Sequence, residues 1–351
     1  MAGSSYGTLF RVSTFGESHG SAVGVVVDGA PAGIEISEEE IQAQLNRRKG
    51  GQSPASTPRA EADRIHLASG IFEGKTTGCP ILMILYNEDA HSSAYDNIKD
   101  LYRPGHADLS FQAKFGIRDW RGSGRASGRE TAARVAAGAL ARKILAKEGV
   151  DILAWTGRVG GIACESFDRD EIERNSLRAC DAKAASKMLD LVEKVREEED
   201  SLGGVVECRI KGVPAGLGEP VFDKLDAELA KAMLSLGAVK GIEFGAGFAA
   251  CNMKGSEHND WMDARGFKTN NAGGILGGIS NGNEIVFRIA VKPTSSIAHP
   301  QKTVAMDGRE VEIRTEGRHD VCICPRIVPV VEAMSAIVLL DMLLRQRSAR
   351  Q

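Results

Sequence analysis

A repeated turn sequence places the strongest constraint on the fold of this chain. The first copy follows three valines at 25–27 and reads Gly29-Ala30-Pro31-Ala32-Gly33, and the second follows Val205-Val206 and reads Gly212-Val213-Pro214-Ala215-Gly216. An amphipathic segment follows each copy, from Ser37 in the first half and from a helix start at Pro220 in the second. The pattern predicts two related halves, each with a strand, turn and helix, packed as one unit. Chance similarity is the alternative, because proline and glycine are common in turns.

Three segments carry helix signals. Ser37 and Glu40 form a capping box, and this helix should end near Arg47-Arg48, where cations suit its negative pole. The alanine-rich segment 129–147 predicts a second helix. The segment 331–347 is apolar on nearly all sides, which predicts a helix buried between layers or at a subunit contact.

The strand signals occur in neighbouring hairpins. Ile285, Phe287, Ile289 and Val291 occupy alternate positions, and 303–313 turns on Asp307-Gly308, a strong hairpin signal. This arrangement favours antiparallel sheets layered with helices over a doubly wound parallel sheet. The predicted fold class is therefore α+β.

Composition excludes several classes of protein. The chain has 351 residues, of which 42% are hydrophobic, so it can bury a substantial core. It lacks a signal-peptide pattern and an uninterrupted apolar run of ~18 residues, which predicts a cytoplasmic protein without a membrane span. With 44 basic and 47 acidic residues, its net charge of −3 indicates no nucleic-acid partner. The seven cysteines never occur in Cys-x-x-Cys spacing, which predicts reduced thiols and no metal site.

Four glycine-framed or charged segments are candidates for chemistry. They are Gly16-Glu17-Ser18-His19-Gly20, Arg103-Pro104-Gly105-His106-Ala107-Asp108, the segment 122–131, and Arg318-His319-Asp320. Two of them place a histidine, His19 or His106, in a turn. Either histidine alone could equally be an ordinary loop residue that satisfies local hydrogen bonds.

Arginines crowd the glycine-rich segment 122–131 and its surroundings. The cluster contains Arg103, Arg118, Arg121, Arg125, Arg129 and Arg134. A glycine-rich loop that runs into a helix offers free amide groups, and arginine binds oxyanions in a bidentate manner, so we predict a phosphate or carboxylate site here. A second glycine cluster, 273–278, predicts that a ligand or another backbone lies close to it.

Six ordered motifs resemble those of the chorismate synthase family almost from end to end. They are GESHG at 16–20, RPGHAD at 103–108, GRASGRETAARVAAGA at 124–139, AGGILGGIS at 272–280, KPTSS at 292–296 and GRHD at 317–320. The resemblance implies a single catalytic domain over 1–351, with internal halves at roughly 1–150 and 200–351. It also implies a sandwich with a helical layer between two antiparallel sheets, and a homotetramer.

The resemblance implies a lyase. The family converts 5-enolpyruvylshikimate 3-phosphate to chorismate and phosphate by a 1,4-elimination, the last common step of the shikimate pathway for aromatic amino acid biosynthesis, and requires reduced FMN without net redox change. By resemblance, His106 is a general acid near the phosphate or flavin, His19 protonates the reduced flavin, and Asp320 assists proton removal with the flavin N5. Surrounding anions are expected to keep both histidines protonated.

The resemblance also carries over binding residues. Cofactor contacts fall on Arg48, Arg125, Ala126, Ser127, Gly237, Ala238, Gly277, Lys292, Pro293, Thr294, Ser295, Ser296 and Arg318. Substrate contacts fall on Arg47, Arg48, Arg103, Arg129 and Arg134. Substrate and FMN together bring about five to six negative charges, so these cations should converge on one cavity. Two positions depart from the family pattern: Pro54 replaces a basic residue, and Ala126 replaces a serine.

Two alternatives remain from the sequence. One is another FMN-dependent oxidoreductase that uses the same phosphate sites, and the other is an anion-binding or assembly protein without turnover. The set of His19, His106 and Asp320 favours an enzyme. The flavin reductant, either NADPH or an external source, stays open.

Overall fold

The computed structural model describes residues 3–51, 55–56, 61–88, 92–315 and 319–349. Its strands form two five-stranded sheets, one built from residues 5–86 and the other from residues 151–291. All paired strands in both sheets run antiparallel. The predicted α+β class with antiparallel sheets is confirmed.

The first sheet has the order β1-β2-β3-β7-β4. Its strands are β1 (Ser5–Tyr6), β2 (Arg11–Gly16), β3 (Ala22–Asp28), β4 (Ile65–Leu67) and β7 (Ile81–Tyr86). Val23, Val25 and Val27 alternate along β3 and are buried in the main core, as expected for one face of a pleated strand. The short hairpin of β5 (Ile71–Phe72) and β6 (Lys75–Thr76) lies between β4 and β7 in the chain.

The second sheet has the order β11-β16-β10-β8-β9. Its strands are β8 (Asp151–Val159), β9 (Ile162–Ala163), β10 (Gly204–Lys211), β11 (Val239–Phe244) and β16 (Ile285–Val291). The alternation predicted for β16 is confirmed, because Ile285, Phe287, Ile289 and Val291 are all buried. Three two-stranded hairpins complete the strands: β12 (Met262–Asp263) with β13 (Gly266–Phe267), β14 (Ile275–Leu276) with β15 (Ile279–Ser280), and β17 (Gln301–Val304) with β18 (Glu310–Ile313). The last of these confirms the hairpin predicted at Asp307-Gly308.

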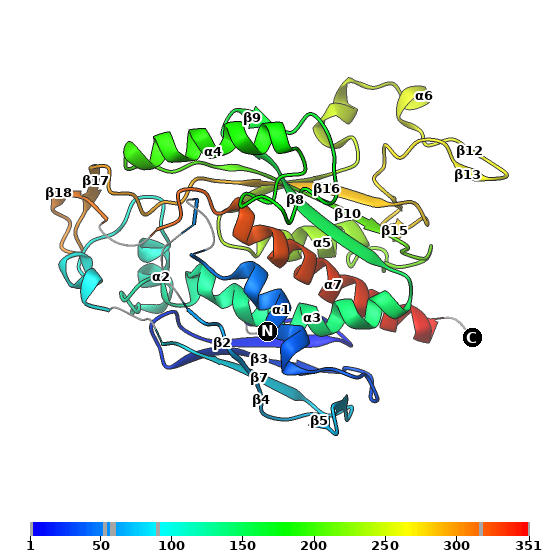
Figure 1. The fold of residues 1–351 in the computed structure, drawn as a ribbon, viewed down its shortest axis with the longest axis horizontal. Helices are drawn as coiled ribbons and strands as arrows, with labels where there is room; N and C mark the ends of the chain where they lie inside the picture. Colours follow the sequence, from blue (N-terminus) through cyan, green and yellow to red (C-terminus); the bar gives the residue numbers. More distant parts are fainter. Residues whose placement is uncertain (1–2, 52–54, 57–60, 89–91, 316–318, 350–351) are drawn as a thin grey trace.

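Helices lie between the two sheets (Figure 1). They are α1 (Glu38–Arg48), α3 (Thr131–Lys147), α5 (Leu225–Leu234) and α7 (Cys324–Ala349). α3 contacts β3 and β7 of the first sheet, whereas α7 contacts β8 and β10 of the second. The two helices also pack closely on each other, since a Cβ added at Gly138 would lie 2.3 Å from the Cβ of Ala333. One continuous core therefore joins both halves of the chain.

α7 is the only helix among the described residues that is long and apolar enough to cross a membrane, and nearly all of it is buried inside the protein. This confirms the helix predicted for 331–347 and extends it at both ends. Figure 1 places α4 (Ala182–Glu197) on the outer face of the second sheet, and the remaining helices are α2 (Asp108–Phe115) and α6 (Gly255–His258). Single-turn or short 3-10 helices occur at Ser92–Ile98, Gly124–Ala126, Gly128–Glu130 and Gly247–Asn252.

The observed ends of α1 and α5 can be compared with the predicted ones. The capping box of Ser37 and Glu40 is present, and α1 ends at Arg48 as predicted. The predicted start at Pro220 is wrong, because α5 begins at Leu225 and the backbone groups of Glu219 and Asp223 pair with each other before it. Both halves nevertheless show the predicted succession of strand, turn and helix, as β3 with α1 and β10 with α5.

Candidate active site

A cavity of about 730 Å³, called the main cavity below, lies among the described residues. Segments far apart in the sequence line it together: 18–19 after β2, Arg48 at the end of α1, 103–107 before α2, 122–134 at the start of α3, 235–238 after α5, 292–296 after β16, and 319–330 at the start of α7. It therefore forms where loops and helix ends of both halves meet.

Most of the predicted site residues line the main cavity. These are His19, Arg48, Arg103, His106, Arg125, Ala126, Ser127, Arg129, Arg134, Gly237, Ala238, Lys292, Thr294, Ser295, Ser296 and Asp320. Arg47, Gly277 and Pro293 are not among its lining residues. Arg318 and Pro54 lie outside the described residues.

Arg47 faces a second cavity of about 690 Å³, which corrects its predicted place in the substrate site. Its Nη1 donates to Glu332 Oε2 at 2.5 Å and its Nη2 donates to Glu173 Oε1 at 2.6 Å. Consecutive helix residues point in different directions, which lets Arg48 face the main cavity while Arg47 faces the second one. Arg47 instead ties α1 to the buried Glu332 of α7.

Gly277 lies in the turn between β14 and β15 with a φ of +61°, a conformation that favours glycine. Its neighbours in the glycine cluster approach other parts of the protein. A Cβ at Gly273 would lie 2.5 Å from the nitrogen of Gly245, and one at Gly278 would lie 2.3 Å from Cγ of Lys224. Of the two explanations for this cluster, the close approach of the protein itself accounts for these glycines.

His106 is held on both ring nitrogens. Nδ1 lies 2.9 Å from Asp108 Oδ1, and Nε2 lies 2.7 Å from Ser123 Oγ. A carboxylate only accepts, so Nδ1–H donates to Asp108 and the neutral ring accepts a hydrogen bond from Ser123 at Nε2. Asp108 also accepts from Arg103, Nε at 2.7 Å and Nη2 at 2.8 Å.

Burial decides the charge of His106 in the ligand-free protein. It lowers the pKa of His106 below the usual 6.5, and this outweighs the opposing hydrogen bond to Asp108. In the ligand-free protein this direction is opposite to the one expected from surrounding anions, because Arg103 and Arg118 also lower the pKa of His106 and Asp108 is already shared with Arg103. Although burial opposes ionisation, hydrogen bonds from Arg103 and His106 lower the pKa of Asp108 well below its ordinary value.

His19 packs closely against the glycine-rich loop. Its Nδ1 lies 3.0 Å from Ser18 Oγ, and its ring meets the ring of Tyr95 edge-on at a centroid distance of 5.2 Å. Gly122 has a φ of +65°, and a Cβ there would lie 2.4 Å from the His19 ring. The loop thus needs glycine at 122 to leave room for this imidazole.

We expect Gly122→Ala to lower turnover at least about tenfold, because the methyl group displaces the ring of His19, one of the predicted catalytic groups. Gly116→Ala is the matched control, since Gly116 has a φ of +72° but no atom within 4 Å of an added Cβ. Both variants carry the backbone cost of about 1–2 kcal/mol. Steady-state kinetics on the two folded variants would contradict this role of Gly122 if both lost activity equally.

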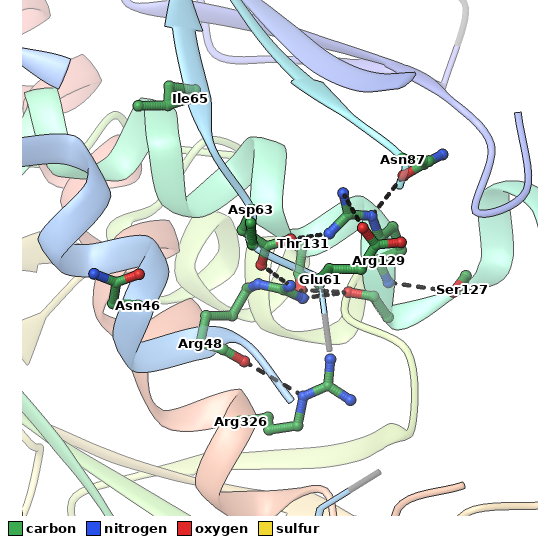
Figure 2. A network of polar contacts seen from close by, with 12 residues as sticks. Asn46, Arg48, Glu61, Asp63, Ile65, Asn87, Ser127, Arg129, Thr131 and Arg326 are labelled. Atoms are coloured by element: carbon green, nitrogen blue, oxygen red, sulfur yellow. Dashed lines mark hydrogen bonds and ion pairs between the residues drawn. The ribbon is translucent and has the colours of Figure 1, made fainter. Parts of the chain in front are cut away.

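A buried carboxylate joins two of the predicted arginines (Figure 2). Arg48 Nη2 donates to Asp63 Oδ2 at 2.5 Å, and Arg129 Nη1 donates to Asp63 Oδ1. The Asp63 side chain is fully buried, and its backbone has a φ of +51°. Arg129 also donates to Asn87 Oδ1 at 2.7 Å. Asp63 therefore neutralises part of the charge that these two arginines bring to the main cavity.

The other cations are held in a similar way. Arg134 Nε donates to Glu130 Oε2 at 2.8 Å, and its Nη1 donates to Ser235 Oγ at 2.6 Å. Arg125 Nη1 donates to the Gly16 carbonyl at 3.1 Å, and Lys292 Nζ donates to the Gly105 carbonyl at 3.2 Å. Burial, and secondarily Lys240, lowers the pKa of Lys292.

Three residues of this region were not predicted from the sequence. Asp108 is inside the RPGHAD motif, and its spacing of two from His106 is the signal that could have found it. Asp63 has no sequence signal. Arg326 lines the main cavity and donates from Nη1 to Asp320 Oδ2 at 2.7 Å, yet it lies outside every motif.

The charges of the main cavity define the class of protein. Among the described residues, seven cationic and three acidic side chains line it, together with three histidines. No group of metal-ligating side chains occurs among the residues that the structure describes. A concave, cation-rich site with imidazole and carboxylate groups is that of an enzyme for a small polyanionic ligand.

Comparisons with known proteins identify the family. The chorismate synthase family model matches residues 10–344. The chorismate synthase of Roseiflexus castenholzii is 55% identical over 355 residues, covering 100% of this chain and 99% of that protein, and the one of Methanosarcina mazei is 56% identical over 354 residues, covering 98% and 97%. A solved structure titled as a crystal structure of chorismate synthase has a TM-score of 0.77 at 33% identity, covering 97% of this chain and 93% of that chain. The chain belongs to the chorismate synthase family, lyases that convert 5-enolpyruvylshikimate 3-phosphate to chorismate in the shikimate pathway.

Proposed function

We propose that the main cavity binds 5-enolpyruvylshikimate 3-phosphate through its cations and eliminates the phosphate there. The convergence of seven cationic side chains with His19, His106 and Asp320 in one cavity carries this proposal. The substrate has two carboxylates and a phosphate, which together give it a net charge of about −3.5 to −4. Arg48, Arg103, Arg129 and Arg134 bind it, whereas Arg47 is left out because it faces the second cavity.

The same cavity has groups and room that fit reduced FMN. One part of the cavity is lined by Arg125, Ala126 and Ser127, and another part by Lys292 and residues 294–296. The backbone N–H of Lys292 donates to the Ala238 carbonyl at 2.9 Å, so residues 237–238 lie beside Lys292. A Cβ at Gly237 would meet no atom nearer than 3.9 Å, so this position is open to a ligand. When bound, reduced FMN supplies the electron density that assists loss of the phosphate without net redox change.

His106 acts as the general acid of the site. Its Nδ1–H donates to Asp108, which fixes the ring and leaves Nε2 to take up and deliver a proton. The ring is neutral when no ligand is bound, because burial lowers its pKa. Anions that enter the cavity favour the imidazolium, so binding itself charges the acid.

Substrate binding should therefore take up a proton at His106. The pKa of His106 is lowered in the free protein and is higher in the complex. Substrate affinity should therefore increase as the pH falls from the pKa of His106 in the complex towards its pKa in the free protein. Calorimetry in buffers of different ionisation enthalpy measures the uptake near neutral pH. The wild-type protein should take up more protons than His106→Gln, and equal uptake would contradict the assignment.

His19 and Asp320 complete the proposed catalytic groups. His19 lines the main cavity beside the glycine-rich loop and acts as a second proton donor. Asp320 assists removal of the substrate proton, and its carboxylate is held by Arg326.

An anaerobic assay with pre-reduced FMN separates this function from its alternatives. The proposed lyase forms chorismate over many turnovers and leaves the flavin reduced. Another FMN-dependent oxidoreductase would consume the reduced flavin stoichiometrically, and an anion-binding protein would form no product. Repeating the assay with NADPH in place of the chemical reductant tests whether the protein reduces the flavin itself.

The remaining proposals concern the whole molecule. The relatives are biosynthetic enzymes, and the one long apolar helix in the described part of the chain is buried. Both points support a cytoplasmic protein without membrane or nucleic-acid partners. The repeated strand, turn and helix supports one catalytic domain, a sandwich of helices between two antiparallel sheets, with pseudo-symmetric halves at roughly 1–150 and 200–351. We also propose a homotetramer, which sedimentation analysis tests.

A further inference from the structure

Arg326 is a cation of the main cavity that lies outside the family motifs of the sequence. It occupies the first turn of α7, and Figure 2 shows it next to the main chain of Arg48. Its Nε donates to the Arg48 carbonyl at 3.4 Å, and its Nη1 donates to Asp320 Oδ2 at 2.7 Å. Arg326 thus connects the end of α1 to the loop that carries Asp320.

Arg326 lines the main cavity and has donors that no described residue uses. Among the described residues, Nη2 has no hydrogen-bond partner, and the side chain keeps 17% of its surface exposed while it lines the main cavity. A guanidinium presents five donors in one plane, so an edge that is not used by Asp320 can receive a second oxyanion.

Other arginines of the cavity are more fully used by the protein. Arg103 donates from Nε and Nη2 to Asp108, and its Nη2 also donates to the Gly122 carbonyl at 2.7 Å. Arg134 is held by Glu130 and Ser235 on Nε, Nη1 and Nη2. The Arg103 side chain is also only 3% exposed, against 17% for Arg326, so Arg326 is better placed than Arg103 or Arg134 to form new hydrogen bonds with a ligand.

We propose that Arg326 binds an oxyanion group of the substrate through its Nη2 edge and at the same time positions Asp320 through Nη1. The inference rests on the proposed function, which places the substrate in the main cavity. One guanidinium then aligns a ligand group and the carboxylate that assists proton removal. Lysine cannot replace it fully, since an ammonium is a point donor and lacks the planar fork.

The test compares Arg326→Gln and Arg326→Lys with Arg345→Gln. Arg345 is a matched control on the same helix, because its side chain is also 17% exposed and it forms an ion pair, with Asp223 at 3.0 Å, but it does not line the main cavity. Calorimetry measures binding of 5-enolpyruvylshikimate 3-phosphate without flavin, and the anaerobic assay measures KM and kcat. Circular dichroism checks that each variant is folded.

We expect Arg326→Gln to weaken substrate binding by about 10- to 100-fold, the loss of a charge-assisted hydrogen bond, and to lower kcat as well through Asp320. Arg326→Lys should retain more binding than Arg326→Gln but less than the wild type, and Arg345→Gln should stay within about twofold. Partial recovery of kcat in Arg326→Ala by free guanidinium, but not in Arg345→Ala, would support a local role.

Substrate affinity within about twofold of the wild type in folded Arg326→Gln overturns the inference. If Arg326→Gln does not fold, wild-type affinity and kcat in Arg326→Lys overturn it equally. Failure of the proposed function looks different, because the wild-type protein would then neither bind the substrate nor form chorismate.

Discussion

Replacing His106 with alanine should lower kcat by about 10²- to 10⁴-fold, the contribution of a positioned general acid, which is the role proposed for this ring. The imidazole is held by Asp108 on one nitrogen and by Ser123 on the other, so both its position and its orientation are fixed. The effect should fall on kcat more than on KM, because arginine and lysine side chains around the ring carry most of the charge that binds the substrate.

Single-turnover measurements with pre-reduced FMN check this result on the chemical step itself. His258→Ala is the control, since His258 lies on α6 and does not line the main cavity. Unchanged turnover in His106→Ala would remove His106 from the mechanism. An equal loss in both variants would show that the effect is one of general stability.

Asp63→Asn should give the largest loss of stability of any single exchange around the main cavity. Its fully buried carboxylate accepts from both Arg48 and Arg129, and the exchange leaves two buried guanidinium groups without this shared anion. Breaking a buried ion pair costs about 3–5 kcal/mol. Asparagine tolerates the left-handed backbone at this position, so the loss reports on charge and not on backbone strain.

Urea denaturation of the ligand-free protein measures this loss. Asp151→Asn is the control, because Asp151 pairs with Arg169 on the surface, where such pairs contribute about 0–1 kcal/mol. Inorganic phosphate should recover part of the stability of Asp63→Asn, since an anion in the main cavity can replace the missing charge. Similar unfolding midpoints for the two variants would contradict the role given to Asp63.

Local features of the fold could be predicted from the sequence because their causes are local. The capping box of Ser37 and Glu40, the alternation along β16 and the turn at Asp307-Gly308 each depend on residues a few positions apart. The start of α5 was not predictable in this way. Pro220 suits a first helical turn, but the backbone groups of Glu219 and Asp223 pair with each other, and the helix begins only at Leu225.

The site was predictable as a set of segments and not as a set of contacts. The motifs indicated that His19, His106 and Asp320 belong with a cluster of arginines, and they line one cavity. Whether Arg47 or Arg48 faces that cavity depends on how α1 is rotated against α7, which its own sequence does not reveal. The same holds for Asp63 and for one contact of Arg326. The arginine partners of Asp63 are 15 or more positions away in the chain, and the Arg48 carbonyl that accepts from Arg326 lies at the end of another helix.

The position of α7 has a consequence for how the chain folds. Residues 324–349 are synthesised after both sheets, yet they contact α1, α3, β8 and β10, so the apolar faces of these elements stay uncovered until the helix has left the ribosome. Contacts over such long sequence separations form slowly and leave partly folded chains prone to association. The nascent protein is therefore less prone to aggregate once this helix has packed against the core and covered these apolar faces.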